Sequence, residues 1–245
     1  MNLTRYAGNE GRGISYDLWS KCPREAIMAD PNFGHFFRDD FMDLATGRYT
    51  ITQATAGTFV LDVTTTVDGG VALADCNSTT DGQGINVQAT LAMPFKPKAG
   101  QILYFEARVK AADIATGPDF FLGLAEQDTT ILASSAISTA NHLGFLSLTD
   151  NNILLHSGEK AGTAVTGVAI HTLVEDTYVK LGFKVTDASK VEWWVNGVKQ
   201  ATSFDLAAAN IPVVGLTPSL VCQTVGTTDP IVHIDWWECF AHVLN

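Results

Sequence analysis

Short apolar segments separated by turn residues run through most of the 245-residue chain, and this pattern constrains the fold more than any other feature. The segments begin near Phe36, and turn pairs such as Asp81-Gly82 and Gly117-Pro118 separate them. Many short strands with almost no helical periodicity indicate an antiparallel β-sandwich of Greek-key or jelly-roll type. Strands are expected near residues 36–41, 48–53, 57–63, 71–74, 85–92, 101–111, 119–126, 142–148, 152–156, 178–186, 190–195, 198–202, 211–222 and 231–242.

The first residues differ from the rest of the chain. Residues 1–34 combine glycines, prolines and scattered aromatic side chains with no lasting period. We therefore expect an irregular N-terminal arm over 1–34, with one short helical turn around Pro23 to Met28, followed by one sandwich domain over 35–245. Aromatic residues of the arm should pack on the sandwich or on a neighbouring molecule, and the sequence leaves both alternatives open.

The stretch VEWWVNGVKQA, residues 191–201, predicts a tight hairpin. Asn196-Gly197 between apolar runs favours a type I′ turn, because both residues of that turn need a positive φ. Trp194 should then lie opposite Lys199, and Trp193 and Trp194 should point to opposite faces of the sheet. We expect Trp193 in the core and Trp194 beside the lysine stem, so the pair cannot form one flat platform for a sugar.

Charge and cysteine content exclude several classes of function. The net charge is −11, with no cluster of Lys or Arg, which argues against nucleic acids and anionic membranes as partners. No apolar run reaches the ~18 residues of a membrane-spanning helix. The four cysteines lack zinc-site spacing, and the start of the chain has no apolar signal segment. We expect no cofactor, and reduced thiols in a protein made in a cytoplasm.

Several strands, in order, resemble those of the concanavalin A-like sandwiches of legume lectins and laminarinases. The resembling stretches are FFRDDF at 36–41, YFEARVKAAD at 104–113, FFLGLAEQD at 120–128, YVKLGFKV at 178–185, VEWWVNGVKQ at 191–200 and HIDWWECF at 233–240. The resemblance implies an all-β, concanavalin A-like jelly roll. It does not by itself imply an activity, because one fold serves many functions.

The carboxylates of the family's hydrolases are not found in this chain. Laminarinase-type enzymes carry a Glu-x-Asp-x-Glu strand, whereas the corresponding stretch here, NHLGFLSLTDNN, has no carboxylate before Asp150. Glu126 and Asp128 lack a third member. The histidines that a lyase of this fold could use form no recognisable set; they are His142, His156, His171 and His233. We therefore expect no enzyme, with a glycanase or polysaccharide lyase as the third alternative.

Calcium-binding loops of the lectin type need six to eight converging oxygen ligands. The candidates are Asp and Asn residues that equally well form turns, namely Asp68, Asp75, Asp81, Asp150, Asn151 and Asn152. The turn interpretation is favoured, and no metal site is predicted.

As a whole, the acidic chain with its aromatic-bearing arm resembles bacteriophage virion proteins of the head decoration type. That resemblance implies a non-catalytic structural protein on the capsid exterior, made in the host cytoplasm, which binds the major capsid protein, often as a homotrimer. Aromatic and Arg side chains dominate interface energies, so the contact residues would be Tyr6, Arg12, Tyr16, Trp19 and Arg24.

The alternative function is a carbohydrate-binding, lectin-like module, free or displayed on a virion, that binds surface glycans. Such a module needs an exposed aromatic ring. The candidates are Trp194 and Trp237, the latter from a Trp236-Trp237 pair of which one member should point outward.

Overall fold

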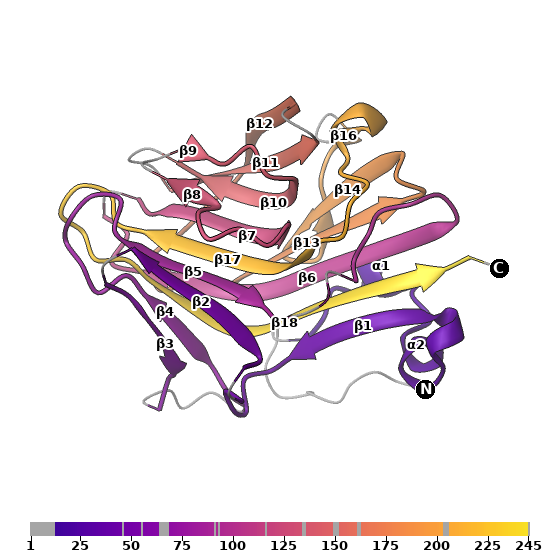
Figure 1. Ribbon diagram of the computed structural model, residues 1–245, viewed down its shortest axis with the longest axis horizontal. Coiled ribbons are helices and arrows are strands. Elements are labelled where there is room, and N and C mark those ends of the chain that lie inside the picture. The colour runs from indigo at the N-terminus through magenta and orange to yellow at the C-terminus, as the bar shows by residue number, and fades with distance from the viewer. Residues whose placement is uncertain are drawn as a thin grey trace.

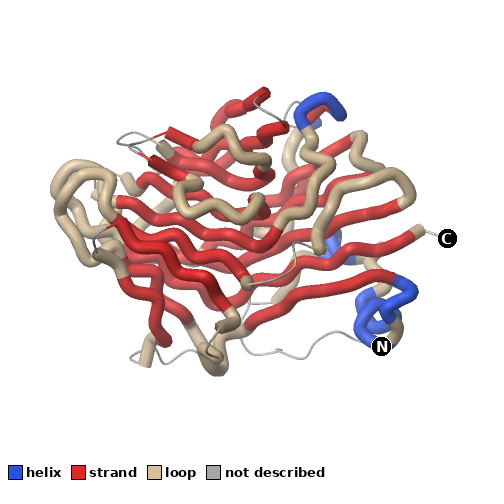
Figure 2. The backbone as a smooth tube through the Cα atoms, viewed as in Figure 1, coloured by secondary structure: helices blue, strands red, loops and turns tan. Residues whose placement is uncertain are grey.

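The computed structural model describes residues 13–45, 47–54, 56–63, 69–90, 92, 94–115, 117–133, 136–148, 152–160, 163–202 and 206–244. In this part of the chain, two antiparallel sheets pack face to face and enclose one large apolar core (Figure 1). Helices occupy only short stretches outside the sheets (Figure 2). The expected antiparallel sandwich is confirmed.

Sheet A is built on two long strands, β6 (Gln101–Ala112) and β18 (Ile231–Val243), which pair along almost their whole length. Its other strands are β1 (Gly34–Asp39), β3 (Thr58–Leu61), β4 (Ala72–Asp75), β13 (Val179–Thr186), β14 (Lys190–Val195), β15 (Val198–Lys199) and β16 (Leu206–Ala207). The order is β15-β14-β13-β6-β18-β4-β3, with β1 also on β18 and β16 on β14.

Sheet B contains β2 (Tyr49–Ala54), β5 (Gly84–Ala89), β7 (Asp119–Ala125), β10 (His142–Ser147), β11 (Ile153–Lys160), β12 (Thr163–Thr172) and β17 (Thr217–Gln223). The order is β12-β11-β10-β7-β17-β5-β2. Between β7 and β10 the chain forms a small hairpin from β8 (Leu132–Ala133) and β9 (Ala136–Ile137). The strands β8, β9, β12 and β16 were not expected from the sequence, and the expected start of β17 is six residues too early.

The core lies between the sheets and follows the alternation of each strand. Trp193 of sheet A is 1% exposed, and its ring lies 5.2 Å, centroid to centroid, from that of Phe145 of sheet B. Phe183 stacks on Phe105 of the neighbouring strand at 5.0 Å. Burial of large aromatic side chains from both sheets supplies much of the free energy that holds the sandwich together.

The predicted hairpin is confirmed in its turn and its register. Asn196 and Gly197 have φ values of 50° and 79°, as a type I′ turn requires. Trp194 lies opposite Lys199, whose ammonium group is 5.6 Å from the centre of the indole ring. Trp193 and Trp194 point to opposite faces, because Trp193 belongs to the core between the sheets and Trp194 to a separate cluster.

The described start of the chain forms a third layer on the outer face of sheet A. This N-terminal layer, residues 13–33, contains α1 (Tyr16–Trp19), α2 (Arg24–Ala29) and the 3-10 turn η1 (Pro31–Phe33); a second 3-10 turn, η3 (Ala208–Asn210), lies elsewhere. The expected helical turn near Pro23 to Met28 is present as α2. Leu18, Trp19 and Ile27 pack on Tyr104, Trp194 and Phe240 of sheet A. None of the helices in the described ranges is long and apolar enough to cross a membrane.

Candidate functional site

The outer face of sheet B carries polar side chains in rows that cross the strands. One row contains Gln88 of β5, Ser219 of β17, Gly123 of β7, Gly144 of β10 and Ser157 of β11, as the pairing registers show. In β5, β7 and β10 the residues on either side of this row belong to the core between the sheets. The described strands of sheet B therefore present hydrogen-bonding groups, rather than Lys or Arg, on this face.

The connection between β7 and β10 folds back over this face. Ile131 and Leu132 pack on Phe121, Leu146 and Val221, which form an apolar strip at the centre of the sheet. Three carboxamide donors fix the position of the connection. Asn86 Nδ2 donates to the carbonyl of Asp128 at 2.6 Å, Gln88 Nε2 to that of Glu126 at 2.9 Å, and Gln223 Nε2 to that of Leu132 at 3.1 Å.

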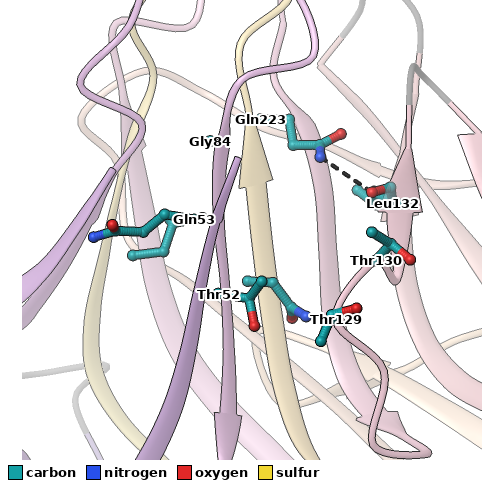
Figure 3. Close-up of a pocket in the computed structure, with 9 residues that line it drawn as sticks. Thr52, Gln53, Gly84, Thr129, Thr130, Leu132 and Gln223 are labelled. Atoms are coloured by element: carbon teal, nitrogen blue, oxygen red, sulfur yellow. Dashed lines mark hydrogen bonds between the residues drawn. The ribbon is translucent and has the colours of Figure 1, made fainter. Parts of the chain in front are cut away.

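A cavity of about 180 Å³ remains between this connection and the strands β2 and β5. Its polar lining consists of three hydroxyl and two carboxamide side chains, none of them charged: Thr52, Asn86, Thr129, Thr130 and Gln223 (Figure 3). Gln53 also borders the cavity, but its carboxamide points away from it and donates to the carbonyl of Gly57. Ile85, Gly84 and Leu132 complete the wall. The lining is therefore mainly polar and uncharged, which suits a ligand that carries hydroxyl groups.

Two carboxamides of the cavity wall have oxygens that are not satisfied within the described chain. Asn86 Oδ1 and Gln223 Oε1 are buried and have no hydrogen-bond partner there. Each side chain is only 6% exposed, and its amide nitrogen is already committed to the β7–β10 connection. A buried acceptor without a donor costs free energy, so a ligand that offers hydroxyl groups would recover that cost.

The carboxylates that sequence analysis weighed for hydrolysis have structural roles in the same connection. Glu126 accepts two hydrogen bonds from Asn141, from the main-chain nitrogen at 3.0 Å and from the side chain at 2.8 Å. Asp128 accepts from Thr130 and from Ser138. The outward positions of β10 hold His142, Gly144 and Leu146, so this strand carries no carboxylate, as the sequence indicated.

His142 and Ser157 form a hydrogen-bonded pair on the outer face of sheet B that sequence analysis missed. His142 Nε2 lies 2.9 Å from Ser157 Oγ, and Glu159 is the residue opposite His142 on β11. All three side chains are at most 2% exposed. Burial lowers the pKa of His142 to about 4, so the imidazole is neutral at pH 7. A buried pair of this kind stabilises the contact of β10 with β11.

The four histidines considered for a lyase are not brought together. His142 points outward from sheet B, whereas His156 points into the core, 5.5 Å from the ring of Trp193. His171 is in β12, and His233 is in sheet A, where its Nδ1 lies 3.5 Å from a carboxylate oxygen of Asp62.

The acidic turn residues do not assemble a metal site in the part of the chain that is described. No group of three or more His, Cys, Asp or Glu side chains there could hold a metal ion. Asp75 accepts from the main-chain nitrogen of Asn77, two residues along, which is the contact expected of a turn former. Asp81 instead accepts from the main-chain nitrogen of Gly226, in the connection between β17 and β18. Asp68, Asp150 and Asn151 lie outside the described residues.

Trp194 and Trp237, the two candidates for stacking on a sugar, are buried. Trp194 is 2% exposed because the N-terminal layer covers it, and its indole nitrogen donates to Asp17 at 2.8 Å. Trp237 is 0% exposed and belongs to the core between the sheets. Trp236 is on the opposite face of β18 and is also buried, at 9% exposure. Neither candidate offers an exposed ring face.

Of the five candidate contact residues of the arm, one is exposed, two pack on the sandwich and two lie outside the described residues. Tyr16 is 81% exposed. Trp19 is buried in the N-terminal layer, and Arg24 forms an ion pair with Glu238 of β18 at 2.5 Å. Tyr6 and Arg12 lie outside the described residues. The described part of the arm thus packs on its own sandwich, one of the two alternatives that the sequence left open.

Two glutamates of sheet A anchor this layer. Glu106 accepts hydrogen bonds from the main-chain nitrogen of Ser15 at 3.0 Å, from the Ser15 hydroxyl and from the Trp19 indole at 2.6 Å. Burial raises the pKa of Glu106 above its usual range. Burial likewise raises the pKa of Glu238 to about 7, against the opposing effect of Arg24.

Comparison with known proteins shows the fold. No family model matches the sequence, and no curated protein does. Solved structures match at low identity. A protein of unknown function from Shewanella oneidensis MR-1, SO2946, is 15% identical with a TM-score of 0.58, over 85% of this chain and 87% of that one. Peanut lectin, solved with a 9mer peptide, is 12% identical with a TM-score of 0.56, over 86% and 98%.

A third match is the exoplasmic/lumenal domain of VIP36 in its Ca²⁺/Man2-bound form. It is 10% identical with a TM-score of 0.55, over 86% of this chain and 88% of that one. These likenesses confirm the concanavalin A-like sandwich that the strand order predicted, and at such identities they show the fold alone.

Proposed function

We propose that this chain is a non-catalytic, lectin-like module that binds a neutral glycan in the cavity beside β2 and β5. The observation that carries the proposal is the pair of buried carboxamide oxygens in the cavity wall, Asn86 Oδ1 and Gln223 Oε1. Sugars present many hydroxyl donors and acceptors, and the five polar side chains that face the cavity match that chemistry.

The charge of the site favours a neutral ligand. None of the nine residues that line the cavity is charged. An anionic sugar would lose its hydration without gaining a cation in the wall, which costs free energy. The lectin structures that share this fold support carbohydrate binding as a class of function.

A glycan array tests the proposal. We expect the intact chain to bind neutral oligosaccharides in preference to sialylated or sulfated ones. Gln223→Met keeps the length of the side chain but removes both of its polar groups, so it should weaken binding at least five-fold. Thr50→Val is the matched control, because Thr50 is exposed on β2 outside the cavity wall and its hydroxyl lies 3.0 Å from that of Thr90. Equal loss in both variants, or no binding to any neutral glycan, would contradict the proposal.

A role on a virion is the second candidate function. The N-terminal layer and the adjoining strand β1 expose four large apolar side chains, Tyr16, Met28, Phe33 and Phe36, by 38% to 81%. Exposed apolar and aromatic side chains favour protein contacts, and the major capsid protein of a phage is the partner that the whole-chain resemblance suggests. Tyr16→Ala should then reduce binding to capsids that lack this protein, while Thr50→Val leaves it unchanged; the native mass of the chain tests the trimer.

A further inference from the structure

Two cysteines from different sheets meet at one end of the sandwich. Cys76 directly follows β4 of sheet A, and Cys222 is in β17 of sheet B. Their Sγ atoms lie 3.3 Å apart, although 146 positions separate the two residues in sequence. We propose that Cys76 and Cys222 form a disulfide that joins sheet A to sheet B when the chain folds under oxidising conditions.

The geometry needs little change to form this bond. A disulfide holds its sulfur atoms about 2 Å apart, so the two thiols must approach by roughly 1 Å. The backbone at both sites is already fixed. The main-chain nitrogen of Cys76 donates to the carbonyl of Pro230 at 3.2 Å, and Cys222 pairs with Ile85 on one side and Phe120 on the other. Small rotations of the side chains can supply the remaining movement.

The chemistry balances with a small disulfide, such as oxidised glutathione, as the oxidant. The thiolate of one cysteine attacks the oxidant, which breaks its S–S bond and releases one glutathione thiolate. The second cysteine, as its thiolate, attacks the resulting mixed disulfide and releases the second glutathione. Two protein thiols are oxidised, one small disulfide is reduced to two thiols, and the two protons pass to the released thiolates.

Burial determines when this exchange takes place. Both thiols are 0% exposed. The hydrogen bond from Cys76 and the burial of the site raise the pKa of Cys222, so the reactive thiolate is scarce in the folded chain. The bond should therefore form while the chain folds, before the two sheets close over the thiols, and the folded protein should resist both oxidation and reduction.

Peptide mapping of the full chain tests the inference. The chain carries Cys22→Ser, because Cys22 is the one cysteine that is not fully buried. It is refolded from denaturant with reduced and oxidised glutathione, then alkylated in denaturant and digested. We expect a cross-linked peptide pair containing Cys76 and Cys222, and an intact mass lower by two hydrogen atoms. Alkylation of both cysteines in the refolded protein, or a bond that uses Cys239 instead, would overturn the inference.

Single cysteine-to-serine variants and the melting temperatures of the oxidised and reduced chains supply the controls. Cys76→Ser and Cys222→Ser should each abolish the cross-link, whereas Cys239→Ser should retain it. Because the bond closes a loop of well over a hundred residues, the oxidised parent should melt roughly 10 °C above its reduced form. If a serine variant does not fold, the peptide map of the parent still decides the question.

Discussion

Glu106 and Glu238 lie directly opposite each other on β6 and β18, and the N-terminal layer buries both carboxyl groups. Ser15 and Trp19 satisfy Glu106, and Arg24 pairs with Glu238. Ser15, Trp19 and Arg24 of the N-terminal layer thus hold it to two glutamates at the centre of sheet A. This arrangement explains why an arm with few regular elements packs in one place, and it makes the docking sensitive to pH.

Stability should fall as the pH rises through neutrality because of Glu238. Its pKa in the folded chain is about 7, above its ordinary value of 4.5, so the folded state holds the proton more tightly than the unfolded state. The contribution is therefore complete below pH 4.5 and is lost as the pH rises through 7. It amounts to roughly 3 kcal/mol.

Urea unfolding between pH 5 and pH 8 measures this effect in the wild-type chain and in Glu238→Gln. We expect the variant to lose most of the decline in the free energy of unfolding over this range. His142, with its lowered pKa, acts in the opposite direction in both chains, so the difference between them reports Glu238 together with its electrostatic coupling to Glu106. An identical pH slope in both chains would contradict the assignment.

Removal of Trp19 should release the N-terminal layer. Its ring stacks on Tyr104 at 5.4 Å and meets Phe240 edge-on at 5.5 Å, so Trp19→Ala should cost about 3–5 kcal/mol of unfolding free energy. Trp19→Phe keeps an aromatic ring but leaves Glu106 without one donor, which should cost about 1–3 kcal/mol. Tyr16→Ala, at an exposed position, should stay within about 0.5 kcal/mol of the wild type. Chemical denaturation measures all three, and a neutral Trp19→Ala would show that the layer does not contribute to stability.

Gly144 should tolerate no side chain. It lies opposite Gly123 on the neighbouring strand, and a Cβ atom at Gly144 would come within 2.4 Å of the carbonyl oxygen of Leu122. The backbones must move apart to accommodate it, so Gly144→Ala should destabilise the chain by about 3 kcal/mol or more. Gly13→Ala is the control, because nothing lies within 4 Å of the Cβ position there. Similar melting temperatures for the two variants would contradict the close pairing of β7 with β10 at these glycines.

Trp194→Phe should separate stability from ligand binding. The change removes the hydrogen bond from the indole to Asp17, at a cost of about 1 kcal/mol, while the ring continues to pack under the N-terminal layer. Binding to any responsive glycan should be unchanged, since Trp194 is on sheet A and the cavity is on sheet B. Loss of glycan binding in a folded Trp194→Phe chain would place the sugar site on sheet A instead.

Features that depend on neighbours along the chain were predictable from the sequence. Asn196-Gly197 and the alternation around it give the hairpin, its register and the opposite directions of Trp193 and Trp194. The order of the main strands indicated the concanavalin A-like sandwich. The strand β12 was missed because its small residues and Gly167 give only a weak apolar alternation.

Features that depend on distant segments were not predictable in the same way. Alternation places Trp194 outside the core, but only the docking of residues 13–33 determines that it is buried. The cavity arises because the β7–β10 connection crosses β5, which brings Thr129 and Thr130 to Asn86. Neither Asn86 nor Gln223 belongs to a sequence motif, so no pattern in the sequence pointed to the site. Their unsatisfied oxygens become evident only in three dimensions.

The most direct test of the account is calorimetric titration of a neutral oligosaccharide into the wild-type chain, Thr52→Val and Thr50→Val. Both substitutions remove one hydroxyl from the outer face of β2, but only Thr52 lines the cavity. Loss of one hydrogen bond to the sugar should weaken binding about five-fold in Thr52→Val and leave Thr50→Val at the wild-type affinity. Equal affinities in all three chains would contradict glycan binding at this cavity.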